Sequence, residues 1–63
     1  MDGNDDAEVI ACGPLVLRIT EVGPLFRWEV LRGDLLLQEG ASISPAAAER
    51  DGGKIARLLA RRG

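Results

Sequence analysis

Side chains of the types that carry enzyme chemistry are scarce in this sequence. Its 63 residues contain no histidine and one cysteine, Cys12, which excludes a histidine acid–base catalyst and a structural zinc site. No base lies beside Cys12 in the sequence to activate it as a nucleophile. The sequence therefore predicts a protein that is not an enzyme and that binds no cofactor or metal.

Two short motifs resemble functional ones but lack the context that their chemistry needs. Gly52-Gly53-Lys54 has neither the preceding strand nor the spacing of a phosphate-binding loop. Arg32-Gly33-Asp34 spells the tripeptide that integrins read, but it lies where a hairpin turn is expected. The acidic residues of the middle of the chain form no recognisable acid–base pair.

Charge is distributed unevenly along the chain, whose net charge is −2. Residues 1–8 carry only acids, whereas residues 54–62 carry only bases, namely Lys54, Arg57, Arg61 and Arg62. The last three could contact an anionic partner, or they could be solvated side chains that complement the negative end of a helix. The second interpretation is favoured, because nucleic-acid-binding domains are strongly basic. Nucleic acid is therefore not the expected partner.

Targeting signals are not recognisable in the sequence. Acidic residues follow Met1, where a signal peptide would have a basic region and then an apolar run. The longest apolar run, Val9–Cys12, is far too short to cross a membrane. A lone thiol fits a reducing compartment, so we expect a cytoplasmic protein with no membrane contact.

A strand over residues 25–32 is the clearest element. Phe26, Trp28 and Val30 alternate with Arg27 and Glu29, which is the pattern of a half-buried strand. The same alternation predicts a strand over 15–22, and a third strand is expected over 35–40. Residues 8–12 could form a short extra strand or an extended lead-in, and residues 1–7 are expected to be a disordered acidic tail.

Turn residues set the predicted pairing of these strands. Proline is disfavoured at the second position of a two-residue loop, so Gly23-Pro24 suggests a four-residue loop, although both loops give the same register. Gly33-Asp34 predicts a two-residue turn. This second register places Val30 opposite Leu37 and Glu29 opposite Gln38.

Together, the two registers predict that the two faces of the sheet differ in polarity. One face collects apolar residues: Leu17, Ile19, Phe26, Trp28, Val30, Leu35 and Leu37. The other carries a polar row of Arg18, Glu29 and Gln38 beside an apolar row of Val16, Leu31 and Leu36. Because a solvated face does not need an apolar row, these aliphatic residues, together with Leu25, are the predicted partner interface.

A helix is predicted over residues 45–62. Ser44 is the expected N-cap and Pro45 the first helical residue. The apolar stripe comprises Ala48, Gly52, Ile55, Leu58 and Leu59. Gly52-Gly53 could break the helix; a continuous helix is favoured because it keeps the stripe on one side, with Gly52 allowing close approach to Trp28.

Part of this pattern resembles a known family. An aromatic strand, a glycine turn, an apolar strand and a serine-started, alanine-rich helix are similar to the small YegP-like domains of unknown function. The resemblance spans about half of the chain and is carried by Phe26, Trp28, Val30, Gly33, Leu35, Leu37, Ser44, Ala47, Ala48, Gly53 and Ile55. It implies a strand–strand–helix unit that pairs with a second copy. The same order also resembles the arm-binding domain of phage integrases, which implies DNA binding through the exposed sheet face.

We therefore expect an α+β fold, in which a three-stranded antiparallel meander (about 15–22, 25–32 and 35–40) packs one C-terminal helix (about 45–62) on one face. Residues 8–63 would be a single β-β-β-α domain. The expected function is a small non-enzymatic interaction module that forms a homodimer or binds a protein partner, since association stabilises a small domain. The alternative is a nucleic-acid-binding sheet domain.

Overall fold

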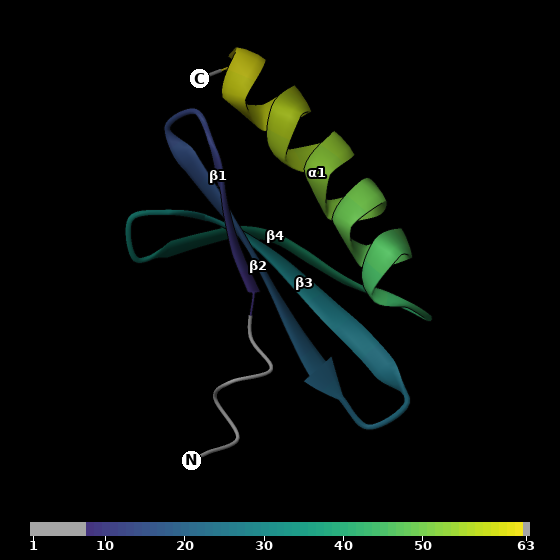
Figure 1. Ribbon diagram of the computed structural model, residues 1–63. Helices are drawn as coiled ribbons and strands as arrows, with labels where there is room; N and C mark the ends of the chain where they lie inside the picture. Colours follow the sequence, from purple (N-terminus) through teal and green to yellow (C-terminus); the bar gives the residue numbers. More distant parts are fainter. Residues whose placement is uncertain (1–7, 63) are drawn as a thin grey trace.

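The computed structural model describes residues 8–62, which form a four-stranded antiparallel sheet with one helix across one face (Figure 1). In chain order the elements are β1 (Glu8–Cys12), β2 (Leu15–Val22), β3 (Leu25–Arg32), β4 (Leu35–Ser42) and α1 (Pro45–Arg62). The α+β class is confirmed. The prediction for residues 1–7 lies outside the described residues.

The prediction of three strands is wrong, because residues 8–12 pair with β2 as a fourth, edge strand. Ile10 and Cys12 pack against the core from this strand. A five-residue strand is too short to show a clear period. The sequence therefore could not distinguish a strand from an extended lead-in at residues 8–12. β4 is also longer than predicted and continues to Ser42.

All three hairpins use a two-residue loop that begins with glycine. Gly13, Gly23 and Gly33 have φ angles of 63°, 60° and 61°, and no other residue type has a positive φ in the described chain. A type II′ turn requires a positive φ only at its first central residue, which leaves the second open to proline. The predicted four-residue loop at Gly23-Pro24 is therefore wrong.

Pairing between β2 and β3 follows the predicted register, with Ile19 opposite Trp28. Pairing between β3 and β4 starts as predicted, but a β-bulge then shifts it by one residue. Val30 lies opposite Gln38 and Glu29 opposite Glu39, so the predicted partners Leu37 and Gln38 are wrong.

The bulge has a steric reason at Trp28. The bulge places Gly40 opposite Trp28, where regular pairing would have placed Glu39. A Cβ atom at Gly40 would lie 2.6 Å from the indole Cε2 atom of Trp28. Only glycine fits there, and the shifted register supplies it.

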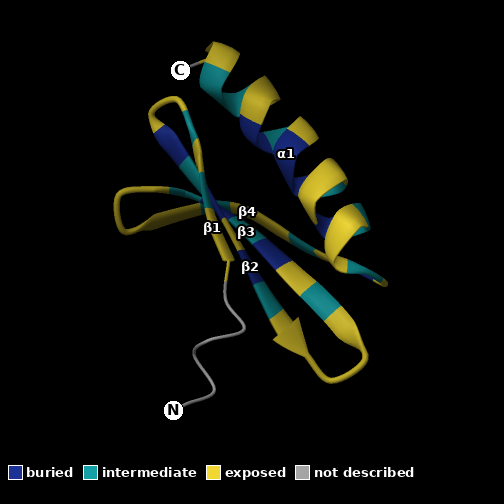
Figure 2. Ribbon diagram, viewed as in Figure 1, coloured by how far each residue is buried: buried dark blue, intermediate teal, exposed yellow. Residues whose placement is uncertain are grey.

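The core lies between the sheet and α1 (Figure 2). Its buried apolar residues are Leu15, Leu17, Ile19, Trp28, Val30, Ala48 and Ala56. Phe26 and Leu37 are half-buried against it. Leu35, predicted for this face, is 61% exposed, because the β3–β4 turn extends away from α1 (Figure 1).

The helix is continuous through Gly52-Gly53, as predicted. Its N-cap is also confirmed, since Ser44 Oγ accepts a hydrogen bond of 3.1 Å from the Ala47 amide. The predicted stripe is wrong at Leu58, which is 48% exposed, because Ala56 faces the sheet instead. Small residues on this side of α1 let the helix approach the sheet closely.

Gly52 marks a close approach between α1 and the sheet. A Cβ atom there would lie 2.5 Å from Leu17 Cδ1 and 3.2 Å from Trp28 Cβ. At the neighbouring Gly53, the nearest such contact is Arg57 Nη1, the end of a flexible side chain, at 3.4 Å. The two adjacent glycines thus have different roles.

We predict that Gly52→Ala destabilises the fold although alanine favours helix formation, because its methyl group would push α1 away from Leu17 and Trp28. Gly53→Ala is the matched control and should raise stability by up to about 1 kcal/mol, the gain in helix propensity. Urea denaturation followed by circular dichroism measures both. Equal effects of the two substitutions would contradict the close approach at Gly52.

Candidate functional site

The sheet face opposite α1 carries an apolar row with one residue from each strand. Its members are paired across neighbouring strands and comprise Ala11, Val16, Leu31 and Leu36. We call this set the outer apolar row. Val16 and Leu31 are half-buried and Leu36 is 41% exposed. The structure thus brings three of the four predicted interface residues together, and β1 adds Ala11.

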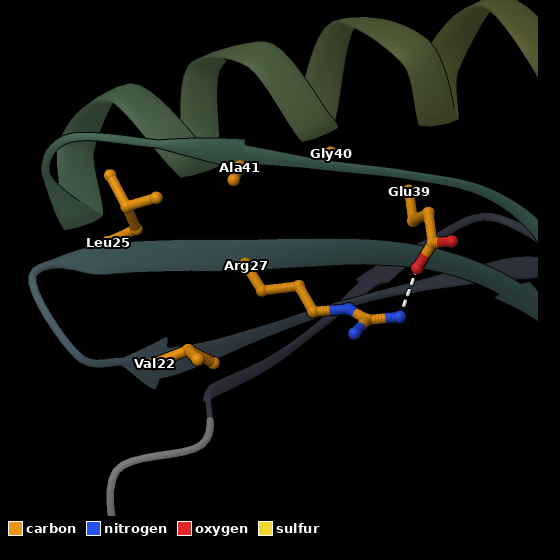
Figure 3. A pocket seen from close by; sticks show the side chains of 6 residues that line it. All are labelled: Val22, Leu25, Arg27, Glu39, Gly40 and Ala41. Atoms are coloured by element: carbon orange, nitrogen blue, oxygen red, sulfur yellow. Dashed lines mark hydrogen bonds and ion pairs between the residues drawn. The ribbon is translucent and has the colours of Figure 1, made fainter.

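Leu25, the fourth predicted interface residue, does not belong to the outer apolar row. It lies six positions before Leu31 on β3, or about 20 Å along an extended strand. Leu25 and Val22 instead border a separate hollow of about 410 Å³ that Arg27 and Glu39 also line (Figure 3). The structure therefore does not bring Leu25 together with the other three residues.

Four charged side chains form an ion-pair network beside the outer apolar row. Arg18 Nη2 lies 2.8 Å from Glu29 Oε1, and Arg27 Nη2 lies 3.4 Å from Glu29 Oε2. Arg27 also pairs with Glu39 (Figure 3). The predicted pair of Arg18 and Glu29 is confirmed, but the bulge replaces Gln38 with Glu39. Both arginines of this face therefore have carboxylate partners.

The predicted anion contacts, Arg57, Arg61 and Arg62, lie in the last two turns of α1. Arg57 and Arg61 line a groove of about 470 Å³ between α1 and β1. The strand side of the groove is formed by Ile10, Ala11, Cys12 and Gly13. Arg62 is exposed and is not among the lining residues. This groove was missed because the sequence left residues 8–12 without an assigned strand.

Metal sites, reactive thiols and membrane-spanning helices each require particular side chains, which can be compared with those of residues 8–62. No group of three or more metal-ligating side chains occurs there. Cys12 is half-buried, and its thiol lies 3.9 Å from the carbonyl oxygen of Ile10. In the same part of the chain, no helix has the length and apolar character needed to cross a membrane.

Comparisons with protein-family models, with curated proteins and with solved structures find no match to this chain. The fold and its surfaces are therefore the basis for any functional argument.

We predict that Glu29→Gln lowers the free energy of unfolding by about 0.5–1 kcal/mol. The Glu29 side chain is only 14% exposed and pairs with both Arg18 and Arg27. Loss of its negative charge therefore removes the partner that the two guanidinium groups share. Urea denaturation at low salt measures the effect, which should shrink at high salt. Glu21→Gln is the control, because Glu21 is exposed and has no ion pair within residues 8–62. An equal effect of the two substitutions would contradict the prediction.

Proposed function

We propose that this chain is a small non-enzymatic interaction module that self-associates through its outer apolar row. The observation that carries this proposal is the row itself, which crosses all four strands on the face that α1 leaves uncovered. Val9, on the same face of β1, adds a side chain that is 64% exposed.

Burial of this row by a second copy would be favourable. Val16 and Leu31 are already half-buried and Leu36 is 41% exposed. Each aliphatic side chain covered would therefore remove on the order of 50 Å² from water, at about 25 cal/mol per Å², before the entropy of association is subtracted. The core of residues 8–62 has seven buried apolar side chains, of which two are alanines. A fold with so small a core gains stability from each association step.

The charges beside the row suit a second copy. Arg18 and Glu29 lie next to each other on neighbouring strands, so the polar row carries both signs. When two such faces meet about a twofold axis, each surface meets its own copy. Mixed charge allows this contact without the repulsion that a row of one sign would cause.

The same charges argue against the alternative function, a nucleic-acid-binding sheet. Binding to phosphates requires cations that are free to replace counterions. Arg18 and Arg27 are both paired with carboxylates on this face. The uncovered face is therefore better suited to a protein surface than to a nucleic acid.

The proposal predicts that the wild-type protein has a mass above that of one chain at high micromolar concentration, and that Leu31→Lys lowers this mass. A lysine in the centre of the row would have to be buried as a charge on association. Sedimentation equilibrium measures both masses.

Val22→Lys is the matched control for Leu31→Lys. It also replaces an aliphatic residue on the outer face of the sheet, but at the opposite end of β2 from the row. Its mass should equal that of the wild type. A monomeric wild type, or a Leu31→Lys variant with the wild-type mass, would overturn the proposal.

A further inference from the structure

The free edge of β1 has backbone groups that point away from the sheet. In a two-residue hairpin, the residues that flank the loop form a hydrogen-bonded pair, and such pairs alternate along the strands. Cys12, Ile10 and Glu8 therefore direct their backbone groups toward β2. Val9 and Ala11 direct theirs outward.

These outward groups have no backbone partner within residues 8–62. Outside the strand and helix ladders of that region, the one backbone hydrogen bond joins the Ala48 amide to the Ser44 carbonyl group. An open strand edge is a template for pairing with another strand.

The two edges of the sheet differ in how far they are protected. β4 contains the β-bulge between the positions opposite Val30 and Leu31, and bulges disfavour the addition of a further strand. β1 has neither a bulge nor a proline or lysine. The groove between β1 and α1 also leaves room beside its edge, because residues of both strand faces, Ile10 and Ala11, line it.

We propose that β1 pairs with β1 of a second copy in an antiparallel register centred on Ile10. This register pairs all five residues of the strand, whereas centring it on Val9 or Ala11 pairs fewer. It places Val9 opposite Ala11 of the second copy, so that the outward backbone groups of both strands bond to one another. The two sheets become one continuous sheet with both helices on the same face.

Charge complementarity identifies the second copy as the occupant. The register places Glu8 of the second copy opposite Cys12, on the sheet side that faces α1. Arg57 and Arg61 line the groove at Cys12. Glu8 is exposed and forms no ion pair with another residue of 8–62. In this register its carboxylate would face these two guanidinium groups. The twofold axis repeats the contact at the other end of the paired strands.

This contact is separate from the outer apolar row and does not depend on it. The row lies on a sheet face, whereas β1 offers an edge. A chain that uses both surfaces forms an assembly larger than a dimer, and a chain that uses only one forms a dimer. The edge contact can therefore be tested in the Leu31→Lys background, where the face contact is weakened.

The test exchanges the charges of Glu8 and of the two arginines, and measures the mass of each variant by sedimentation equilibrium at high micromolar concentration. In the Leu31→Lys background, the parent protein should have the mass of two chains. Glu8→Arg should have the mass of one, because its new side chain would face Arg57 and Arg61. The double variant Arg57→Glu and Arg61→Glu should also be monomeric. An equimolar mixture of the two variants should regain the mass of two chains, because both contacts then join opposite charges.

Ala11→Pro tests the backbone part of the contact. The amide hydrogen that this substitution removes faces away from β2, so the fold should persist, which circular dichroism can verify. Pairing between the two copies of β1 should be blocked. Ala11→Ser, which keeps the amide hydrogen, is the control and should remain dimeric. A monomeric parent, a dimeric Glu8→Arg variant or a mixture that stays monomeric would overturn the edge contact. The mass of the wild type, measured beside that of the parent, separates the two proposals. A dimeric wild type with a monomeric parent would contradict the edge contact alone, whereas equal masses above one chain would contradict the face contact alone.

Discussion

The steric fit of Trp28 between two glycines is the constraint on which the rest of this structure depends. Its indole ring lies against Gly40 on the neighbouring strand, and its Cβ atom lies against Gly52 on the helix. Neither position has room for a methyl group. The fit at Gly40 accounts for the β-bulge in β4, and the fit at Gly52 sets how closely α1 approaches the sheet. A large aromatic residue thus occupies a small core because both of its neighbours lack side chains.

The position of α1 determines which surfaces remain open. Because small residues bring the helix close to β2 and β3, one helix is enough to bury the centre of the inner face of the sheet. Nothing in the described chain covers the outer face, where alternation along the strands places the outer apolar row. The last turns of α1 come near β1 but leave a groove beside its edge, lined by Arg57 and Arg61. The surfaces that we propose for association are therefore the ones that the single helix leaves uncovered.

Sequence reasoning recovered the elements whose signals are local. Alternation around Trp28 gave the β2–β3 register and, with it, the neighbouring positions of Val16 and Leu31. Ser44, Pro45 and the periodic stripe gave the bounds of α1. The bulge could not be derived in this way, because it depends on the fit between Trp28 and Gly40, which lie on different strands. For the same reason the sequence missed Glu39 in the ion-pair network and the groove at β1, both of which exist only after the strands have paired.

The most direct test of the central constraint is a double-mutant cycle between Gly40 and Trp28. Urea denaturation would give the free energy of unfolding of the wild type, Gly40→Ala, Trp28→Leu and the double variant. If the indole ring fills the space beside Gly40, Gly40→Ala should destabilise the wild type but have little effect on Trp28→Leu, in which the shorter side chain leaves room for the new methyl group. The coupling energy should then exceed about 1 kcal/mol. Additive effects of the two substitutions would contradict the account.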